Sequence, residues 1–302
     1  MREAELLAQL RAIFDRAPKP DLRVGNGDDG AVFDPNGREV VVSSDLAVEG
    51  IHFRKEWSSS FEIGRKITAA NLADICAMGG WPEYLVVNVA LPAKYLDDAV
   101  DLARGIAAEA DRVGAQVIGG DLSSGSELTI SITALGYCNR PVKRSGAQVG
   151  EAIVVTSLPG SSAAGLELLR SGRSDGSELA AQVIAHHKAP NLDYERYRNV
   201  AVLLSSATDI SDGLVVDATH LANASGVRFA LTSGALRNSE LAKLDSARYL
   251  DWVLGGGEDH ILLGTTSEPE RSGMVVIGRV EAGDGVTLDG APVTNQGFTH
   301  SW

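Results

Sequence analysis

Apolar side chains recur along the chain at two spacings, and these predict alternating helices and strands. Helical spacing predicts helices over residues 3–14, 61–78, 96–113, 163–170 and 214–224. Short runs rich in Val, Ile and Leu predict strands over residues 39–44, 84–91, 116–118, 127–136, 152–156, 261–264 and 274–280. Strands that alternate with helices in this way are typical of α/β folds, in which helices are layered on a sheet.

A polar stretch, NRPVKRSGAQVG at residues 139–150, interrupts the pattern near the middle of the chain. A chain of 302 residues is also long for a single hydrophobic core. We therefore predict two α/β domains with mixed sheets, one of residues 1–138 and one of residues 139–302.

Charge and cysteine content restrict the partners and the compartment. The net charge is −13, from 27 Lys and Arg against 40 Asp and Glu, which argues against nucleic acid or an anionic membrane as the main partner. Cys76 and Cys138 stand in apolar segments without CxxC spacing, so we expect buried thiols. No run approaches the roughly 18 apolar residues of a membrane span, and the charged N-terminus does not read as a signal peptide, so we expect a cytoplasmic protein.

Aspartates recur beside Gly, Ser or Asn where an apolar run ends or a helix begins. The first pair lies in GNGDDGAVF, at residues 25–33, where two adjacent carboxylates repel each other unless a divalent cation lies between them. The same turn alone could be an ordinary solvated loop. Seven carboxylates share this setting, and together they predict one metal site built from distant segments: Asp28, Asp29, Asp45, Asp74, Asp121, Asp209 and Asp212.

Two further polar features have a functional and a structural interpretation. Asn71 and Asp74 lie one turn apart in an otherwise apolar helix, so they are expected to point inward or into a cleft. The segment LPGSS, residues 158–162, precedes a predicted helix. It could bind phosphate through backbone N–H groups, although a plain N-cap is the commoner use of such residues.

The order of these turns resembles that of the thiamine-monophosphate kinase family, in the superfamily of aminoimidazole ribonucleotide synthetase and selenophosphate synthetase. The matching stretches are GNGDDGAVF, SSDLAVEGIHF, AANLADICAMGG, VIGGDLSSG, KRSGAQVGEAIVVT, SSAAGL, DISDGLVVD and LGGGEDHILL. The resemblance implies a two-domain synthetase-like fold with a nucleotide cleft between the domains. It also implies that residues 1–138 bind ATP and Mg2+ and form a homodimer.

Carried over position by position, the resemblance implies three sets of site residues. The Mg2+ ligands would be Asp29, Ser43, Ser44, Asp45, Asp74, Asp121, Asp209 and Asp212. The ATP contacts would be Gly120, Asp121, Arg144 and Ser211. The thiamine phosphate contacts would be His52, Glu258 and a C-terminal aromatic, for which Phe298 is preferred to Trp302. From the residues alone, His52 between Ile51 and Phe53 is more commonly a packed, hydrogen-bonded side chain.

The implied reaction is transfer of the ATP γ-phosphoryl group to thiamine monophosphate, giving thiamine diphosphate and ADP. Several Mg2+ ions in an acidic cleft would screen the repulsion between the two polyanions. The sequence departs from the family pattern at Gly30 and Leu122, and at His260, where Tyr is common. Arg112 and Val113 replace an aromatic expected to stack on adenine. A synthetase with another phosphorylatable substrate and a non-catalytic Mg-nucleotide-binding regulator are the alternatives.

Overall fold

The computed structural model describes residues 3–14, 17, 19–24, 32–293 and 297–298, and the chain forms two units. Unit 1 comprises Met1–Ile75 and Gly80–Pro141, and unit 2 comprises Cys76–Gly79 and Val142–Trp302. The chain thus passes from unit 1 to unit 2 between Pro141 and Val142, close to the predicted boundary after residue 138. Each unit contains a mixed sheet with helices, which confirms the predicted α/β class.

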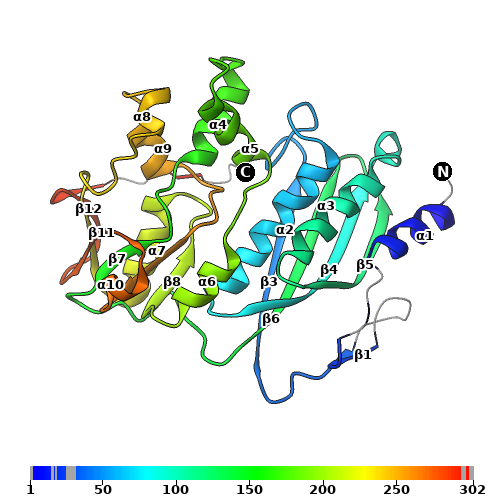
Figure 1. Cartoon of the computed structure of the whole chain (residues 1–302), viewed down its shortest axis with the longest axis horizontal. Helices are drawn as coiled ribbons and strands as arrows, with labels where there is room; N and C mark the ends of the chain where they lie inside the picture. The colour runs from blue at the N-terminus through cyan, green and yellow to red at the C-terminus, as the bar shows by residue number, and fades with distance from the viewer. Residues whose placement is uncertain (1–2, 15–16, 18, 25–31, 294–296, 299–302) are drawn as a thin grey trace. The chain divides into compact units, whose positions relative to one another are not determined.

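Unit 1 is built on a four-stranded sheet with the order β3-β6-β4-β5. Its strands are β3 (Glu39–Val48), β4 (Trp81–Leu91), β5 (Gln116–Ser124) and β6 (Thr129–Cys138). Its helices are α1 (Glu3–Phe14), α2 (Ser60–Ala77), the 3-10 turn η1 (Ala93–Tyr95) and α3 (Ala99–Asp111). Figure 1 shows α2 and α3 on one face of this sheet. The two helices can approach closely because Gly64 has no side chain: a Cβ there would lie 2.3 Å from the Leu102 carbonyl oxygen.

The other face of the unit 1 sheet carries exposed apolar side chains. Side chains along β3 alternate between the two faces of the sheet. Val41 and Ala47 point to the buried face, and Val40, Val42 and Leu46 point to the other. Val42 and Leu46 are 58% and 56% exposed there, and Val40 is also exposed. We call this surface of β3 and its neighbouring strands the open face.

A small two-stranded sheet covers one end of the open face. It consists of β1 (Leu22–Val24) and β2 (Val32–Phe33), whose Leu22 and Phe33 pack against Tyr84 and Tyr137. The Asp21 carboxylate accepts hydrogen bonds from both tyrosine hydroxyls, at 2.6 Å and 3.1 Å. These bonds satisfy polar groups that would otherwise be costly to bury.

Unit 2 is built on a seven-stranded sheet with the order β13-β12-β9-β11-β7-β10-β8. Its strands are β7 (Ala152–Val155), β8 (Ser206–Asp209), β9 (Arg228–Leu231), β10 (Leu262–Thr266), β11 (Val275–Glu281), β12 (Gly285–Leu288) and β13 (Ala291–Pro292). Its helices are α4 (Ser161–Ser171), α5 (Glu178–Lys188), α6 (Tyr194–Ala201), α7 (Leu214–Ser225), α8 (Leu241–Leu244), α9 (Tyr249–Gly255) and α10 (Pro269–Ser272). In the hydrophobic core of unit 2, Leu214 and Leu221 of α7 pack in one cluster with strand residues such as Phe229.

Several elements differ from the predictions. Strand β3 continues past residue 44, and β5 passes through Gly119 and Gly120 as strand where a turn was predicted. The predicted last strand is followed by β12 and β13. The other elements that were not predicted are β1, β2, β8, β9, η1, α5, α6, α8, α9 and α10. Cys76 and Cys138 are buried free thiols, as predicted. Among the described residues, no helix is long and apolar enough to cross a bilayer.

Candidate functional site

In unit 1, strand β3 presents two predicted metal ligands to helix α2. Ser43 Oγ donates a 2.6 Å hydrogen bond to Asp74 Oδ2. Two residues further along the same face of β3, the Asp45 backbone N–H donates to Asn71 Oδ1 at 3.2 Å, and Asn71 Nδ2 donates to the Ile67 carbonyl at 2.9 Å. Asn71 is fully buried, so the prediction that it points inward is confirmed. Its amide fixes the strand against the helix at the level of Asp45 and Asp74.

Ser44 and Asp121 lie away from that cluster. Ser44 points to the open face, where its hydroxyl lies 2.9 Å from Thr133 Oγ1. Asp121 is exposed on β5 and paired with Asn88 of β4, a register that places it on the open face as well. Strand β5 is three strand spacings from β3, roughly 14 Å. Unit 1 therefore joins Ser43, Asp45 and Asp74 but holds Asp121 at the opposite edge of its sheet, and the ligand roles of Ser44 and Asp121 stay predictions.

Gly120, a predicted ATP contact, lies where two backbones meet. Its φ is +154°, and a Cβ there would be 1.9 Å from the Val87 carbonyl oxygen. A side chain at this position would push β5 away from β4. The structure thus gives Gly120 a packing role, and its contact with ATP stays a prediction.

His52 follows β3 in a tight turn and is hydrogen-bonded through its ring. The Val48 backbone N–H donates to His52 Nδ1 at 3.1 Å, and Lys66 Nζ donates to the His52 carbonyl at 3.2 Å. An Nδ1 that accepts from an amide belongs to the neutral tautomer with its proton on Nε2. The packed, hydrogen-bonded interpretation therefore holds for Nδ1, and a substrate contact would have to use the Nε2–H side of the ring.

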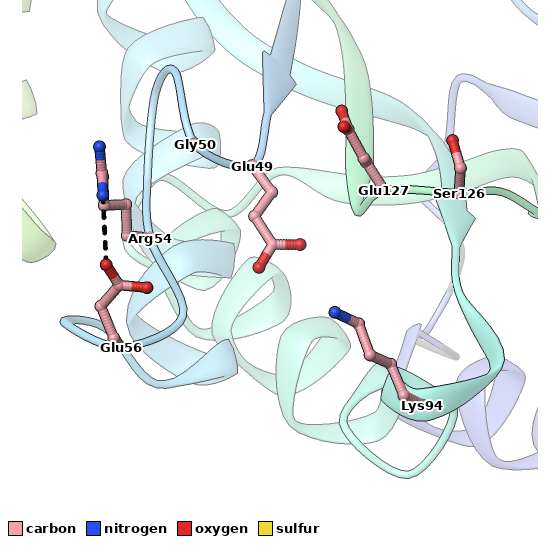
Figure 2. Close-up of a pocket in the computed structure, with 7 residues that line it drawn as sticks. All are labelled: Glu49, Gly50, Arg54, Glu56, Lys94, Ser126 and Glu127. Carbon is pink, nitrogen blue, oxygen red and sulfur yellow. Dashed lines mark hydrogen bonds and ion pairs between the residues drawn. The ribbon is translucent and has the colours of Figure 1, made fainter.

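A pocket lies beside this turn (Figure 2). It is lined by Glu49, Gly50, Arg54, Glu56, Lys94, Ser126 and Glu127. Arg54 and Glu56 form an ion pair of 3.3 Å, and Glu49 accepts a 2.7 Å hydrogen bond from the Tyr95 hydroxyl. None of the predicted site residues lines this pocket, and its charges are of both signs. We therefore do not place the reaction there.

In unit 2, the turn after β8 gathers three carboxylates. Asp209 ends the strand, Asp212 lies in the turn, and Asp217 lies in the first turn of α7. Asp217 is only 2% exposed, and its Oδ2 accepts hydrogen bonds from the backbone N–H groups of residues 211, 212 and 213, at 3.1, 3.1 and 3.2 Å. It thus caps the N-terminus of α7 and holds the turn in place.

Asp217 is a functional candidate that the sequence analysis missed. Burial raises its pKa to about 7, and the nearby negative charges of Asp209 and Asp212 add to that rise. A cation among these carboxylates would relieve the repulsion. Asp217 is the last residue of the DISDGLVVD stretch, and an acidic residue in the first turn of a predicted helix is the signal that could have identified it.

The same turn holds two predicted substrate contacts. The Glu258 backbone N–H donates to the Ser211 carbonyl at 2.8 Å, and the Phe298 N–H donates to the Asp212 carbonyl at 3.0 Å. Gly257 allows the first contact, because a Cβ there would lie 2.4 Å from the Ser211 carbonyl oxygen. The structure therefore brings the backbones at Glu258 and Phe298 next to Ser211 and Asp212.

Asp259, the next residue, has a structural role. It is almost fully buried, and its carboxylate accepts hydrogen bonds from the backbone N–H groups of Gly160 at 2.6 Å and Ser162 at 2.9 Å. His186 Nε2 lies 3.2 Å from the same carboxylate. Two amide groups at the start of α4 are thus taken by protein, which favours the capping interpretation of LPGSS over phosphate binding.

Arg144 lies on an exposed segment that runs beside β8. Lys143 accepts a 3.0 Å backbone hydrogen bond from Ala207, and the Ser225 hydroxyl donates to the Arg144 carbonyl at 3.3 Å. The backbone is therefore anchored while the Arg144 side chain stays exposed. An exposed guanidinium on a fixed backbone suits a phosphate group.

The donors present suit Mg2+ in chemistry, although no complete set of ligands is assembled. They are carboxylate and hydroxyl oxygens, the hard ligands that Mg2+ prefers. Within the described parts of the chain, no three His, Cys, Asp or Glu side chains form a group that could hold a metal ion. Asp28, Asp29 and Trp302 lie outside the described residues, and the remaining ligand candidates are divided between the two units.

Comparison with known proteins identifies the class and then the family. Residues 27–138 match the family described as AIR synthase related protein, N-terminal domain, so this segment is of the AIR synthase-related class. It is 38% identical over 290 residues to thiamine-monophosphate kinase from Mycobacterium tuberculosis, covering 93% of this chain and 86% of the relative. The chain belongs to the thiamine-monophosphate kinase family.

Two solved structures agree with this assignment. A crystal structure of thiamine-monophosphate kinase from Stenotrophomonas maltophilia K279a has a TM-score of 0.86 and 28% identity, covering 97% of this chain and 98% of the other. AaThiL complexed with AMPPCP and TMP has a TM-score of 0.83 and 28% identity, covering 100% and 99% of the two chains. The likeness thus extends over both units.

Proposed function

We propose that this protein transfers the γ-phosphoryl group of ATP to the phosphate of thiamine monophosphate, producing thiamine diphosphate and ADP. Family membership supports the reaction. The structural observation that carries the proposal is the turn of Ser211 and Asp212, whose two carbonyls hold the backbones of Glu258 and Phe298. The proposed acceptor contacts are thereby fixed beside proposed metal ligands, which suits a reaction that depends on positioning.

In this proposal, some side chains hold the metal ions and others contact the nucleotide. The carboxylates of Asp45, Asp74, Asp209 and Asp212 would hold Mg2+, with Asp29, Ser43, Ser44 and Asp121 as further ligands. Bound Mg2+ would neutralise the phosphate charge that develops during transfer. The acceptor phosphate is already an anion at neutral pH, so no general base is required. Gly120, Asp121, Arg144 and Ser211 would contact ATP.

The acceptor pocket would select thiamine monophosphate by charge and shape. The Glu258 carboxylate pairs with the cationic thiazolium or the aminopyrimidine of the acceptor. Phe298, with a half-exposed ring, packs on an acceptor ring. His52 orients the acceptor with its Nε2–H, since Nδ1 is engaged by Val48.

We further propose that the protein is a homodimer formed through the open face of unit 1. Val40, Val42 and Leu46 expose apolar surface on the edge strand β3. Apolar surface on a sheet is stabilised when a second protein surface covers it. A second copy of the chain offers the same surface, as a two-fold symmetric interface requires.

The test is ADP release measured with ATP and Mg2+ alone, with thiamine monophosphate, and with free thiamine. Rapid release is expected only with thiamine monophosphate, because free thiamine offers a hydroxyl that needs a base. Comparable turnover on free thiamine would show that the reaction is wrong. ATP binding without ADP release under any condition would favour the non-catalytic regulator.

The acceptor contact is tested separately with Glu258→Gln, which keeps the size of the side chain and removes its charge. The KM for thiamine monophosphate should rise, while ATP binding stays unchanged. Glu270→Gln, an exposed acid on α10, is the control. An unchanged KM in Glu258→Gln would remove Glu258 from the pocket and leave the reaction standing.

A further inference from the structure

His260 and Asp209 form a buried pair behind the carboxylate turn of unit 2. His260 Nδ1 lies 3.0 Å from Asp209 Oδ2, and the two residues are 7% and 4% exposed. A carboxylate only accepts at this distance, so the imidazole donates from Nδ1–H. This is the one hydrogen bond to the Asp209 carboxylate found among the described residues, and it engages Oδ2 alone.

The backbone holds His260 in an uncommon conformation to make this contact. Its φ is +52°, in the left-handed region that most side chains avoid but that His adopts more readily than most. Its N–H donates to the Ile210 carbonyl at 2.9 Å, and its own carbonyl accepts from the Tyr197 hydroxyl at 3.2 Å. Both backbone groups are thus fixed, and the imidazole is directed at Asp209. A strained residue that is held this firmly commonly serves a site.

We propose that His260 is a positioning residue for the metal site, orienting the Asp209 carboxylate so that Oδ1 faces the cation. The inference rests on the proposed function, in which Asp209 is a Mg2+ ligand. By engaging Oδ2, the imidazole removes the rotational freedom of the carboxylate, so less entropy is lost when the cation binds.

The experiment compares two substitutions at residue 260 in the full chain. His260→Asn keeps an N–H on the atom bonded to Cγ and tolerates the left-handed backbone. His260→Leu keeps a similar bulk and removes the donor. Mn2+ affinity is measured by electron paramagnetic resonance in the absence of nucleotide, and the Mg2+ dependence of turnover is measured separately. Thermal unfolding in EDTA reports the structural cost of each change.

His260→Leu should weaken Mn2+ binding by about 10- to 100-fold, the usual effect of losing an outer partner of a ligand. Its Mg2+ requirement should rise while kcat at saturating Mg2+ recovers. His260→Asn should stay within about threefold of the wild type on both measures. Equal Mn2+ affinity in His260→Leu and the wild type would overturn the proposal, and so would equal losses in the two variants.

Asp209→Asn separates this inference from the proposed function. If Asp209→Asn and His260→Leu both weaken Mn2+ binding, the proposal stands. If only Asp209→Asn weakens it, Asp209 is a ligand and the positioning role of His260 is refuted. If Asp209→Asn binds Mn2+ like the wild type, the proposed ligand itself is wrong and the inference falls with it.

Discussion

Ser43 and Asp74, 31 positions apart in the sequence, are joined by a 2.6 Å hydrogen bond between the edge strand β3 and the helix α2. The hydroxyl donates and the carboxylate accepts, so the bond holds the two side chains together where the strand meets the helix. Neither partner is a strong structural requirement for its own element, because Ser and Asp are both poor choices for the interior of a strand or helix. The pair is better explained by a site than by the fold.

Asp74→Asn should therefore abolish turnover without unfolding unit 1. The amide keeps the size of the side chain but is a weaker Mg2+ ligand. We expect kcat/KM to fall by more than about 100-fold, the upper end of the effect of outer-sphere partners. Asp101→Asn, at an exposed acid that pairs with Arg104, serves as the control. Near-normal activity of Asp74→Asn at saturating Mg2+ would contradict the assignment.

Charge placed on the open face should separate the proposed dimer. Light scattering of the wild type should give about twice the chain mass of 31.7 kDa at micromolar concentration. Val42→Glu and Leu46→Glu should shift the mass toward 31.7 kDa, because burying an unpaired carboxylate is costly. Val149→Glu, at an exposed apolar residue of unit 2, should leave the mass unchanged. A monomeric wild type would refute the dimer.

Asp217 should make stability depend on pH when no divalent cation is present. Its pKa of about 7 in the folded protein exceeds its ordinary value of 3.8, so the folded state keeps a proton that the unfolded state has lost. The resulting stabilisation is full below about pH 4 and is lost as the pH rises through 7.

Melting temperatures in EDTA between pH 4 and 8 test this behaviour against Asp217→Asn. The amide oxygen of Asn can still accept from the turn amides but cannot titrate. The melting temperature of Asp217→Asn should therefore increase relative to that of the wild type as the pH rises. Asp251→Asn, at an exposed acid on α9, should show no such relative increase. If the difference in melting temperature between Asp217→Asn and the wild type stays constant from pH 4 to 8, the pKa of the Asp217 carboxyl is not raised by folding.

Gly257→Ala should impair the acceptor site through the backbone alone. The new methyl group would meet the Ser211 carbonyl at 2.4 Å and force Glu258 away from the turn. A displacement of this kind can cost roughly 100-fold in turnover. Gly234→Ala meets nothing within 4 Å and is the matched control. Unchanged kinetics in Gly257→Ala would mean that the turn and Glu258 move independently.

Periodicity in the sequence predicted five of the ten α-helices and seven of the thirteen strands among the described residues, and each of these buries apolar side chains. The helix at residues 3–14 agrees with α1 to the residue. The ends of β3 and β5 were misjudged because polar residues such as Asp45 and Asp121 remain in strand through pairing with β6 and β4. Pairing with a distant strand leaves no local periodic signal. Helices α6, α8, α9 and α10 span eight residues or fewer, which is too short for a clear periodic signal. Helix α5 was missed because its buried residues, Ala180, Val183 and His187, form a weak apolar stripe.

The candidate site was predicted as a set of residue types and not as an arrangement. The sequence indicated which aspartates stand at turns, and the resemblance supplied their roles. It could not indicate which of Ser43 and Ser44 faces α2, since adjacent side chains of a strand alternate but the packing and the register with β6 decide which face is which. The roles of Asp217 and His260 were also not predicted from the sequence, because both depend on contacts that form only in the folded chain.

The order of strands in unit 1 has a consequence for synthesis on the ribosome. Strand β3, which carries Ser43 and Asp45, pairs only with β6 in the described sheet, and β6 is the last strand of the unit to be translated. The ladder between them is therefore a contact of high sequence separation, which forms slowly. While β4 and β5 emerge, the nascent β3 is unpaired on both edges, and its Val41 and Ala47, which are buried in the folded unit, are uncovered. Until residue 138 leaves the exit tunnel, this half of the site has no sheet to join, and the growing chain is most exposed to aggregation in that interval.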